Sequence, residues 1–247
     1  MAWTMRTQLV TFSANTRGRD FAVGDVHGHF SILWRDLQAL GFDTACDRLF
    51  AVGDLVDRGP ESAQVPDWLD KPWFHAVRGN HEAMTLAALS GDEQAMRFHQ
   101  ANGGEWLQAL EEPQRSRIGA TLQALPLAME VHTAHGAVGL VHADLPTDDW
   151  QDLRSSTLSA RDASYCLWSV DRMAQQYAGE VRNIRAVVHG HITLPRMQVL
   201  GNVHFIDTHH SQLPPGQQGH FTFLELATLK AHCGQGPAWV KVPARYR

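Results

Sequence analysis

Short apolar runs that end at polar residues beside glycine recur along the chain. There are five such runs: Phe21–Val23, Leu49–Val52, His75–Val77, Val138–Val141 and Ile184–Val188. Apolar runs of this length are typical of strands buried on both faces of a sheet. Because ligands of open α/β sheets gather outside the carboxyl ends of the strands, we expect the polar residues after these runs to converge on one site.

Helical periodicity follows the first run. Apolar residues recur with helical spacing at Phe30, Leu33, Trp34, Leu37 and Leu40, and Gly41 ends the pattern. This pattern predicts a strand-loop-helix unit. A shorter crossover over residues 60–69 opens with Pro60 and Glu61, which suit the first turn of a helix.

The middle of the chain changes character. Residues 83–125 are rich in Ala, Leu, Gln and Glu, with interruptions at Gly91, Gly103-Gly104 and Pro113. These residue types favour helices, so we expect a helical insertion or cap.

The last part of the chain returns to β structure after a helical stretch over residues 148–177. The strands expected here and just before that stretch are Leu127–His132, Ala137–Val141, Met197–Leu200, Val203–Ile206, Phe221–Leu226 and Ala238–Val242. The tail strands are separated by Gly and Pro turns, so we expect a second sheet packed on the first. With 247 residues and 44% hydrophobic residues, the chain fits a single domain over residues 1–247.

Charge and cysteine content narrow the class of protein. The net charge is −5 and no basic stripe occurs, so nucleic acid is not an expected partner. Three well-separated cysteines, Cys46, Cys166 and Cys233, argue against a disulfide framework. The N-terminus has no apolar signal region and no stretch reaches the ~18 apolar residues of a membrane span, so we expect a cytoplasmic protein without membrane contact.

Five polar segments carry the candidate chemistry. In order they are Gly24–Gly28, Gly53–Gly59, Gly79–Glu82, Val141–Ala143 and His189–His191. Asp, His and Asn are the oxygen and nitrogen ligands that hold Mn, Fe or Zn, and the neighbouring glycines allow sharp turns. The set therefore predicts a two-metal site.

These motifs resemble the phosphoprotein phosphatases within the calcineurin-like metallophosphoesterases, particularly the small bacterial and bacteriophage lambda-type members. The likeness runs from Phe21 to about Asp207, and it is most specific in Gly53–Gly59 followed by Arg78–Glu82. The resemblance implies an α/β fold, a β-sandwich flanked by helices with a helical insertion.

The resemblance also implies the metal ligands. Asp25, His27 and Asp54 would hold the first ion, and Asp54, Asn80, His142 and His191 the second. A bridging Asp54 would help to keep the ions about 3.5–4 Å apart, sharing the hydroxide that attacks phosphorus directly. Mn is the expected metal, with Fe, Zn, Co and Ni as alternatives, because these ligand types tolerate all of them.

Three further residues take catalytic roles by the same resemblance. His81 would protonate the leaving oxygen, a task that suits an imidazole with an ordinary pKa of about 6.5. Asp57 would orient His81, and Arg58 would grip the phosphoryl oxygens through its planar fork.

Two positions depart from the lambda-type pattern. A second phosphate-binding arginine is expected two residues after Trp168, where Val170 stands; Arg172 is the nearest replacement, with a solvated helix arginine as the equally weighted alternative. Where the family commonly has glycine after Asp207-Thr208, this chain has His209 and His210. We favour solvated loop residues over the alternative, a loop that overhangs the metals.

His189 and Asp144 leave alternatives open. His189 lies two residues before His191, so on a strand both side chains would share a face. We favour His191 as the ligand because it follows the glycine as the family's ligand does. Asp144 could hydrogen-bond to a ligand histidine or cap the turn before Pro146.

The predicted function is a dinuclear-metal phosphatase acting on phosphomonoesters, most of all phosphoserine and phosphothreonine on proteins, with phosphotyrosine and small phosphomonoesters as further substrates. A symmetrical diadenosine tetraphosphate hydrolase is the enzymatic alternative; that family commonly has alanine at the position of Asp57 and aspartate at that of Glu82. A silent binding module is the non-enzymatic alternative, and it conflicts with the complete ligand set. The sequence leaves the oligomeric state and the physiological substrate open.

Overall fold

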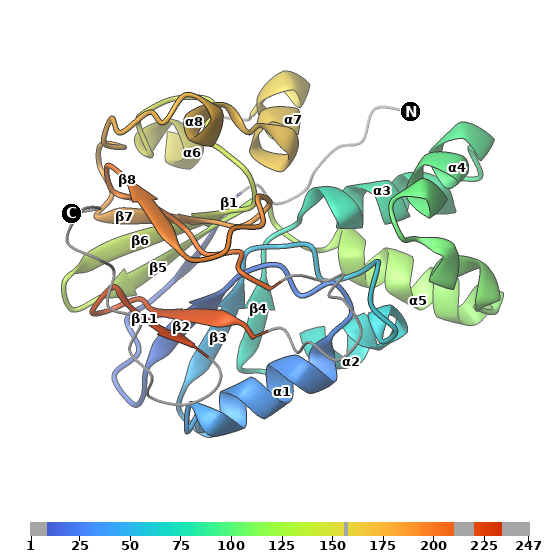
Figure 1. Ribbon diagram of the computed structural model, residues 1–247, viewed down its shortest axis with the longest axis horizontal. Helices are drawn as coiled ribbons and strands as arrows, with labels where there is room; N and C mark the ends of the chain where they lie inside the picture. Colours follow the sequence, from blue (N-terminus) through green and yellow to red (C-terminus); the bar gives the residue numbers. More distant parts are fainter. Residues whose placement is uncertain (1–8, 156–157, 210–219, 234–247) are drawn as a thin grey trace.

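Two β-sheets stacked face to face form the centre of the protein, and helices cover their outer faces (Figure 1). The computed structural model describes residues 9–155, 158–209 and 220–233. This is the α/β sandwich that the sequence predicts.

The first sheet has six strands in the order β1-β5-β6-β7-β9-β8. Their bounds are β1 Leu9–Phe12, β5 Ala128–Thr133, β6 Gly136–Val141, β7 Ala186–His189, β9 Val203–Phe205 and β8 Gln198–Leu200. β6, β7 and β9 run parallel, so the loops that follow them leave the same edge of the sheet.

The second sheet has five strands in the order β11-β10-β2-β3-β4. Their bounds are β11 Lys230–Cys233, β10 Thr222–Glu225, β2 Asp20–Val23, β3 Arg48–Ala51 and β4 Phe74–Ala76. β2, β3 and β4 run parallel, and therefore their carboxyl ends also meet at one edge.

The helices form three groups. The elements are α1 Phe30–Ala39, η1 Ser62–Gln64, α2 Val65–Leu69, α3 Asn80–Leu89, α4 Glu93–Ala101, η2 Glu105–Ala109, α5 Glu112–Gln123, α6 Gln151–Ser155, α7 Ala160–Trp168 and α8 Asp171–Ala174. α1 and α2 lie under the five-stranded sheet, α6 to α8 lie over the six-stranded sheet, and α3 to α5 project at one side (Figure 1).

Successive side chains along each strand point to opposite faces of its sheet, and this alternation builds the layered core. Phe21 and Val23 of β2 pack with α1, whereas Ala22 between them faces the other sheet. In β7, Val188 faces the partner sheet and Val187 faces the α6–α8 layer. Both sheets are thus buried on two faces, which explains why their strands appear as continuous apolar runs.

The structure corrects several sequence expectations. The tail strands do not form a sheet of their own: β8 and β9 extend the sheet of β5 to β7, whereas β10 pairs with β2. Two strands, β1 and β11, have no counterpart in the sequence analysis. The predicted strand at 238–242 lies outside the described residues.

The crossover after Gly59 also differs from expectation, because its helical turns begin at Ser62 rather than at Pro60. Glu61 is tied to α1 instead: its carboxylate accepts a hydrogen bond from the Ser31 amide at 2.7 Å, and its own amide donates to the Gly28 carbonyl. Helix α1 itself begins and ends as predicted. Over the described ranges, every helix is too short or too polar to cross a lipid bilayer.

Candidate active site

The six predicted metal ligands come together where the two groups of parallel strands end. Asp25 and His27 follow β2, Asp54 follows β3, and Asn80 opens α3 directly after β4. His142 and His191 follow β6 and β7 of the other sheet. The site therefore lies at the junction of the two sheets; five of these side chains are almost fully buried, and His191 is half-buried.

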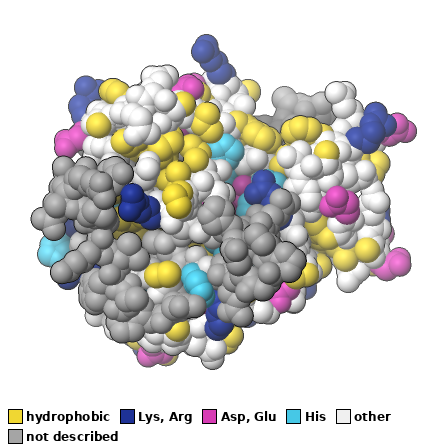
Figure 2. All heavy atoms as spheres, viewed as in Figure 1, with side chains coloured by type: hydrophobic (Ala, Val, Ile, Leu, Met, Phe, Trp, Pro, Cys, Tyr) yellow, Lys and Arg dark blue, Asp and Glu magenta, His cyan; other side chains and the backbone are white. Residues whose placement is uncertain are grey.

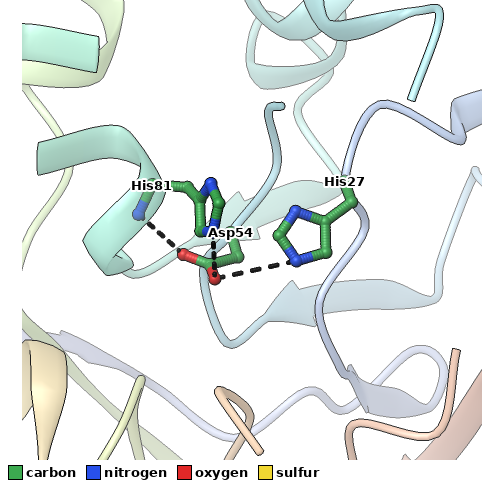
Figure 3. Close-up of side chains that lie close together, drawn as sticks. All are labelled: His27, Asp54 and His81. Atoms are coloured by element: carbon green, nitrogen blue, oxygen red, sulfur yellow. Dashed lines mark hydrogen bonds and ion pairs between the residues drawn. The ribbon is translucent and has the colours of Figure 1, made fainter. Parts of the chain in front are cut away.

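Asp54 is at the centre of this cluster. One carboxylate oxygen, Oδ2, lies 3.8 Å from the Nε2 atoms of both His27 and His81 (Figure 3). The other oxygen, Oδ1, lies 3.3 Å from His142 Nε2 and accepts the backbone N–H of His81 at 3.0 Å. The two oxygens thus face two different sets of nitrogen atoms, as a bridging carboxylate does.

The second set of potential ligands surrounds the Asn80 amide. Its oxygen lies 2.8 Å from His142 Nε2 and 3.1 Å from His191 Nδ1. The amide O and N could be exchanged at this position, and the exchanged NH₂ would lie against the same two rings and Asp54. With the oxygen in place, lone pairs from three side chains converge, and such a set of acceptors is suited to a cation.

Backbone carbonyls fix the tautomers of two of these imidazoles. His27 Nδ1 lies 3.0 Å from the Val56 carbonyl oxygen, and His142 Nδ1 lies 2.8 Å from that of Val52. A carbonyl only accepts, so Nδ1 carries the proton in both rings and the Nε2 lone pair faces the site. This is the form in which histidine binds a metal.

Asp25 joins the cluster from the side of His191. Its carboxylate accepts the His191 backbone N–H at 3.1 Å, and one of its oxygens lies 4.0 Å from His27 Nε2. A Cβ on Gly190 would lie 2.1 Å from Asp25 Oδ1, so the glycine between the two histidines makes room for this carboxylate.

The electrostatics of the site fit bound cations. Burial lowers the pKa of His27 to about 3 and that of His191 to about 4, which keeps both rings neutral and their lone pairs available. Burial, together with neighbouring carboxylates, raises the pKa of Asp25 and brings that of Asp207 to about 7. Buried negative charge in this amount is costly unless positive charge compensates for it.

Left-handed backbone is concentrated in the same loops. Non-glycine residues with positive φ include His27 at 46°, Asp54 at 48°, Asp57 at 72°, Arg58 at 67° and His191 at 65°. Such conformations cost about 1–3 kcal/mol each and persist only where the surroundings impose them. Their clustering at the predicted ligands supports a functional site.

Glu82 ties two of these loops together. Its carboxylate accepts the backbone N–H groups of Asp54, Leu55 and Gly79 at 2.7–2.8 Å. Burial and the Asp54 charge raise its pKa to about 7. By sequence Glu82 only separates the two subfamilies, whereas in the structure its carboxylate positions Asp54.

His81 and Asp57 form the predicted pair. His81 Nδ1 lies 2.7 Å from Asp57 Oδ2, and both side chains are buried. Burial lowers the pKa of His81, but Asp54 and Asp57 outweigh burial and raise it overall. Burial alone would raise the pKa of Asp57, but hydrogen bonds from His81 and His99 outweigh burial and lower that pKa overall.

Arg58 lies between the two histidines on the first side of Asp54. Its Nη1 lies 2.8 Å from His27 Nε2, and its Nη2 lies 3.0 Å from His81 Nε2. The guanidinium therefore faces the site, at the exposed end of the cluster. In the middle of the face drawn in Figure 2, basic, acidic and histidine side chains come to the surface side by side, next to hydrophobic ones.

Arg172 is buried, which rules out the solvated helix arginine that the sequence left open. Its Nη1 donates to the Gly179 carbonyl at 2.6 Å, its Nη2 pairs with Asp148 at 2.5 Å, and its guanidinium lies over the Tyr177 ring. These partners would have to be exchanged before Arg172 could bind phosphate.

The remaining histidines have defined places. His189 Nδ1 lies 2.8 Å from the Val141 carbonyl, and this residue belongs to neither of the two candidate metal-binding groups found among the described residues. His209 is buried rather than solvated, stacked on Phe221 with 4.2 Å between ring centroids. His210 lies outside the described residues. Asp144 accepts the Arg172 backbone N–H, so it holds α8.

The two candidate groups share Asp54. One contains His27, Asp54 and His81, and the other Asp54, His142 and His191. The first group contains His81, whereas the resemblance implies Asp25 as the third ligand of that ion. Because His81 Nδ1 is bonded to Asp57, only its Nε2 could turn toward an ion. The donor set as a whole, with carboxylate, amide and neutral imidazole, fits divalent cations such as Mn or Fe.

The sequence did not predict the contacts that four residues make at the site: His99, Trp106, Asp207 and Glu82. A signal existed for the first two, because Asn102-Gly103-Gly104-Glu105-Trp106 interrupts a helix-favouring segment. For Asp207 the sequence offered only its place in the family's Asp-Thr pair, because its proximity to Asp25 depends on the pairing of β9 with β7.

The fold and this cluster of Asp, His and Asn side chains are those of a two-sheet phosphoesterase. The sequence model of the calcineurin-like phosphoesterases matches residues 21–217, and the chain belongs to this family. It is 36% identical over 191 residues to serine/threonine-protein phosphatase 1 of Salmonella typhimurium, covering 76% of this chain and 85% of the relative.

Other similarities are shorter or concern the fold alone. The symmetrical bis(5'-nucleosyl)-tetraphosphatase of Methylococcus capsulatus is 37% identical over 128 residues, which cover 51% of this chain and 43% of that protein. A crystal structure described as a putative diadenosine tetraphosphatase superposes with a TM-score of 0.64 at 22% identity, covering 94% of this chain and 99% of that one. The latter likeness supports the fold only.

Proposed function

We propose that this protein is a dinuclear-metal phosphatase that hydrolyses phosphomonoesters, with phosphoserine and phosphothreonine on proteins as its main substrates. The position of Asp54 carries the proposal, because its two oxygens face different histidines, 3.8 Å from His27 and 3.3 Å from His142. A carboxylate placed in this way can be shared by two cations.

Asp25, His27 and Asp54 would hold one divalent cation, and Asp54, Asn80, His142 and His191 the other. When bound, the two cations polarise the phosphoryl oxygens and acidify a water molecule. We propose Mn as the metal. The phosphoryl group then passes to water without a phosphoenzyme.

The side chains around this centre complete the reaction. Arg58 exchanges its contacts with His27 and His81 for the phosphoryl oxygens, which suit its planar pair of N–H donors. Once Arg58 has left Nε2, His81 takes up a proton there, and Asp57 stabilises the resulting imidazolium through Nδ1. This Nε2 proton then passes to the leaving oxygen. A positioned acid of this kind contributes about 10²- to 10⁴-fold to the rate.

Two observations favour protein substrates over dinucleotides. The similarity to the serine/threonine-protein phosphatase extends over 85% of that protein, whereas the similarity to the tetraphosphatase covers 43% of it. Asp57 and Glu82, which separate the two branches by resemblance, both make buried contacts in the site.

We also propose that the protein is cytoplasmic and forms a single domain, in which residues 83–125 are a helical insertion.

A substrate panel tests the proposal. Metal-free protein is supplied with Mn²⁺ and given phosphoserine, phosphothreonine and phosphotyrosine peptides, p-nitrophenyl phosphate and diadenosine tetraphosphate. We expect kcat/KM to be highest for the phosphoserine or phosphothreonine peptides. A preference for diadenosine tetraphosphate would establish the alternative branch, and no turnover of any substrate would refute an enzymatic function.

A further inference from the structure

The Asp57 carboxylate has partners in addition to His81. Its second oxygen, Oδ1, lies 2.8 Å from His99 Nε2 and accepts Trp106 Nε1–H at 2.7 Å. His99 lies in α4 and Trp106 in η2, so both belong to the helical segment and to none of the five motifs. His99 is 1% exposed and Asp57 is completely buried.

The direction of each hydrogen bond follows from the chemistry of the groups. Indole N–H can only donate, and an ionised carboxylate can only accept. The Thr85 hydroxyl, 3.0 Å from His99 Nε2, donates its own hydrogen to the His81 carbonyl. His99 Nε2 therefore carries a proton and donates it to Asp57.

Backbone contacts connect the same segment to Arg58. The Arg58 amide donates to the Gly103 carbonyl at 2.9 Å, which supports the left-handed conformation of Asp57 and Arg58. A Cβ on Gly103 would lie 2.8 Å from the Arg58 amide nitrogen, and one on Gly104 would lie 2.3 Å from the His99 ring. Gly103 thus lets this segment approach Arg58 closely, and Gly104 makes room for the His99 ring.

We propose that His99 and Trp106 are positioning residues for proton transfer, holding the plane of the Asp57 carboxylate so that Oδ2 faces His81 Nδ1. The inference rests on the proposed function, in which His81 protonates the leaving oxygen. Because His99 and Trp106 both donate to Oδ1, only one orientation of the carboxylate satisfies these two hydrogen bonds and the one from His81 to Oδ2. The orientation of the acid is then set by the helical segment over residues 99–106, and not by the Gly53–Gly59 motif alone.

Substitutions that remove one donor each test this role. His99→Leu and Trp106→Phe remove the N–H groups at similar side-chain volume, and His99→Gln restores a donor. Trp73→Phe is the matched control, because Trp73 packs against Trp34 and Phe42 on the far side of the five-stranded sheet. Each variant is measured as Mn²⁺-loaded protein with phenyl phosphate, a poor leaving group, and with p-nitrophenyl phosphate, a good one.

We expect His99→Leu and Trp106→Phe to lower kcat for phenyl phosphate by about 10- to 100-fold, and for p-nitrophenyl phosphate by clearly less. Metal content should stay at the wild-type level. His99→Gln should recover most of the lost rate, and Trp73→Phe should match wild type. Equal losses for both substrates, or no recovery in His99→Gln, would overturn the positioning role.

A second measurement needs no turnover. In metal-free protein labelled with ¹⁵N-histidine, the His81 ring should show a single Nδ1–H tautomer, assigned by comparison with His81→Asn. Trp106→Phe should give a mixture of tautomers, and an unchanged His81 signal would contradict the inference. A wild-type protein without phosphatase activity would refute the proposed function, and the spectra would still decide the positioning role.

Discussion

The carboxylate of Asp54 occupies the space that a side chain at position 79 would need. A Cβ on Gly79 would lie 2.2 Å from Asp54 Oδ1 and 2.5 Å from the Asp54 backbone nitrogen. The backbone at Gly79 is extended, with φ −98° and ψ 179°, so any residue could adopt it. The glycine is therefore required by the position of Asp54 and not by backbone conformation.

This relationship predicts the effect of Gly79→Ala. The methyl group should displace the Asp54 carboxylate, and because Asp54 is shared, the affinity for both cations should fall by about 10- to 100-fold. Calorimetric titration with Mn²⁺ measures this loss. Gly119→Ala is the control, since a Cβ there approaches only a Leu89 methyl group at 3.2 Å. Wild-type affinity in Gly79→Ala would show that Asp54 does not hold the ions.

His81→Asn should separate metal binding from proton donation. Asparagine cannot supply a proton to the leaving oxygen, so we expect turnover of poor leaving groups to fall by about 10²- to 10⁴-fold with metal content unchanged. An activated aryl phosphate should lose much less, because its leaving oxygen hardly needs a proton. A leaving-group series gives the test, and a uniform loss across it would remove His81 from the role of acid.

Arg172→Ala distinguishes support of the fold from binding of phosphate. The guanidinium contacts with Asp148 and with the Gly179 carbonyl predict a loss of about 1–3 kcal/mol in the free energy of unfolding. If Arg172 also serves as the second phosphate-binding arginine, inhibition by inorganic phosphate should weaken as well. Val170→Arg in the same variant should then restore that inhibition. Unfolding curves and inhibition constants report the two effects separately.

His204 should make stability depend on pH. Burial, with Arg185 nearby, lowers its pKa to about 4, below the value of about 6.5 expected in the unfolded chain. The unfolded state therefore binds the proton more readily, so the contribution of His204 to stability is complete above pH 6.5 and is lost as the pH falls toward 4. The full loss is at most about 3 kcal/mol.

His204→Leu should remove this dependence. Urea unfolding of both proteins at pH 7 and pH 5 gives the comparison, in which other titrating groups cancel. We expect the wild type to lose more free energy of unfolding than the variant between these two pH values. Equal losses would mean that His204 is protonated in the folded protein.

The convergence of the six candidate ligands was predictable because each lies within a few residues of the end of an apolar run, and these runs end at a common sheet edge. Asp25, Asp54 and His142 needed only this local pattern and the resemblance to be assigned. β1 and β11 are marked less clearly, because β1 is a short run, Leu9–Phe12, that is only half-buried, and β11, Lys230–Cys233, contains no apolar run.

Long-range contacts set the remaining features of the site. His99 reaches Asp57 across 42 positions of the sequence, and Arg172 is buried by a turn whose carbonyls it binds. Neither contact leaves a periodic pattern in the chain. The division of the tail strands between the two sheets likewise depends on which strand edge each segment meets, and alternation of residues along a strand does not specify its neighbour.

Phosphopeptide hydrolysis, measured as Mn²⁺ is added stepwise to metal-free protein, tests the dinuclear mechanism most directly. If Asp54 bridges two ions, the rate should stay low through the first equivalent and rise as the second binds. Asp54→Ala should bind neither ion tightly and remain inactive. Full activity at one equivalent of metal, or a wild-type rate that is unaffected by removing metal, would contradict a dinuclear phosphatase.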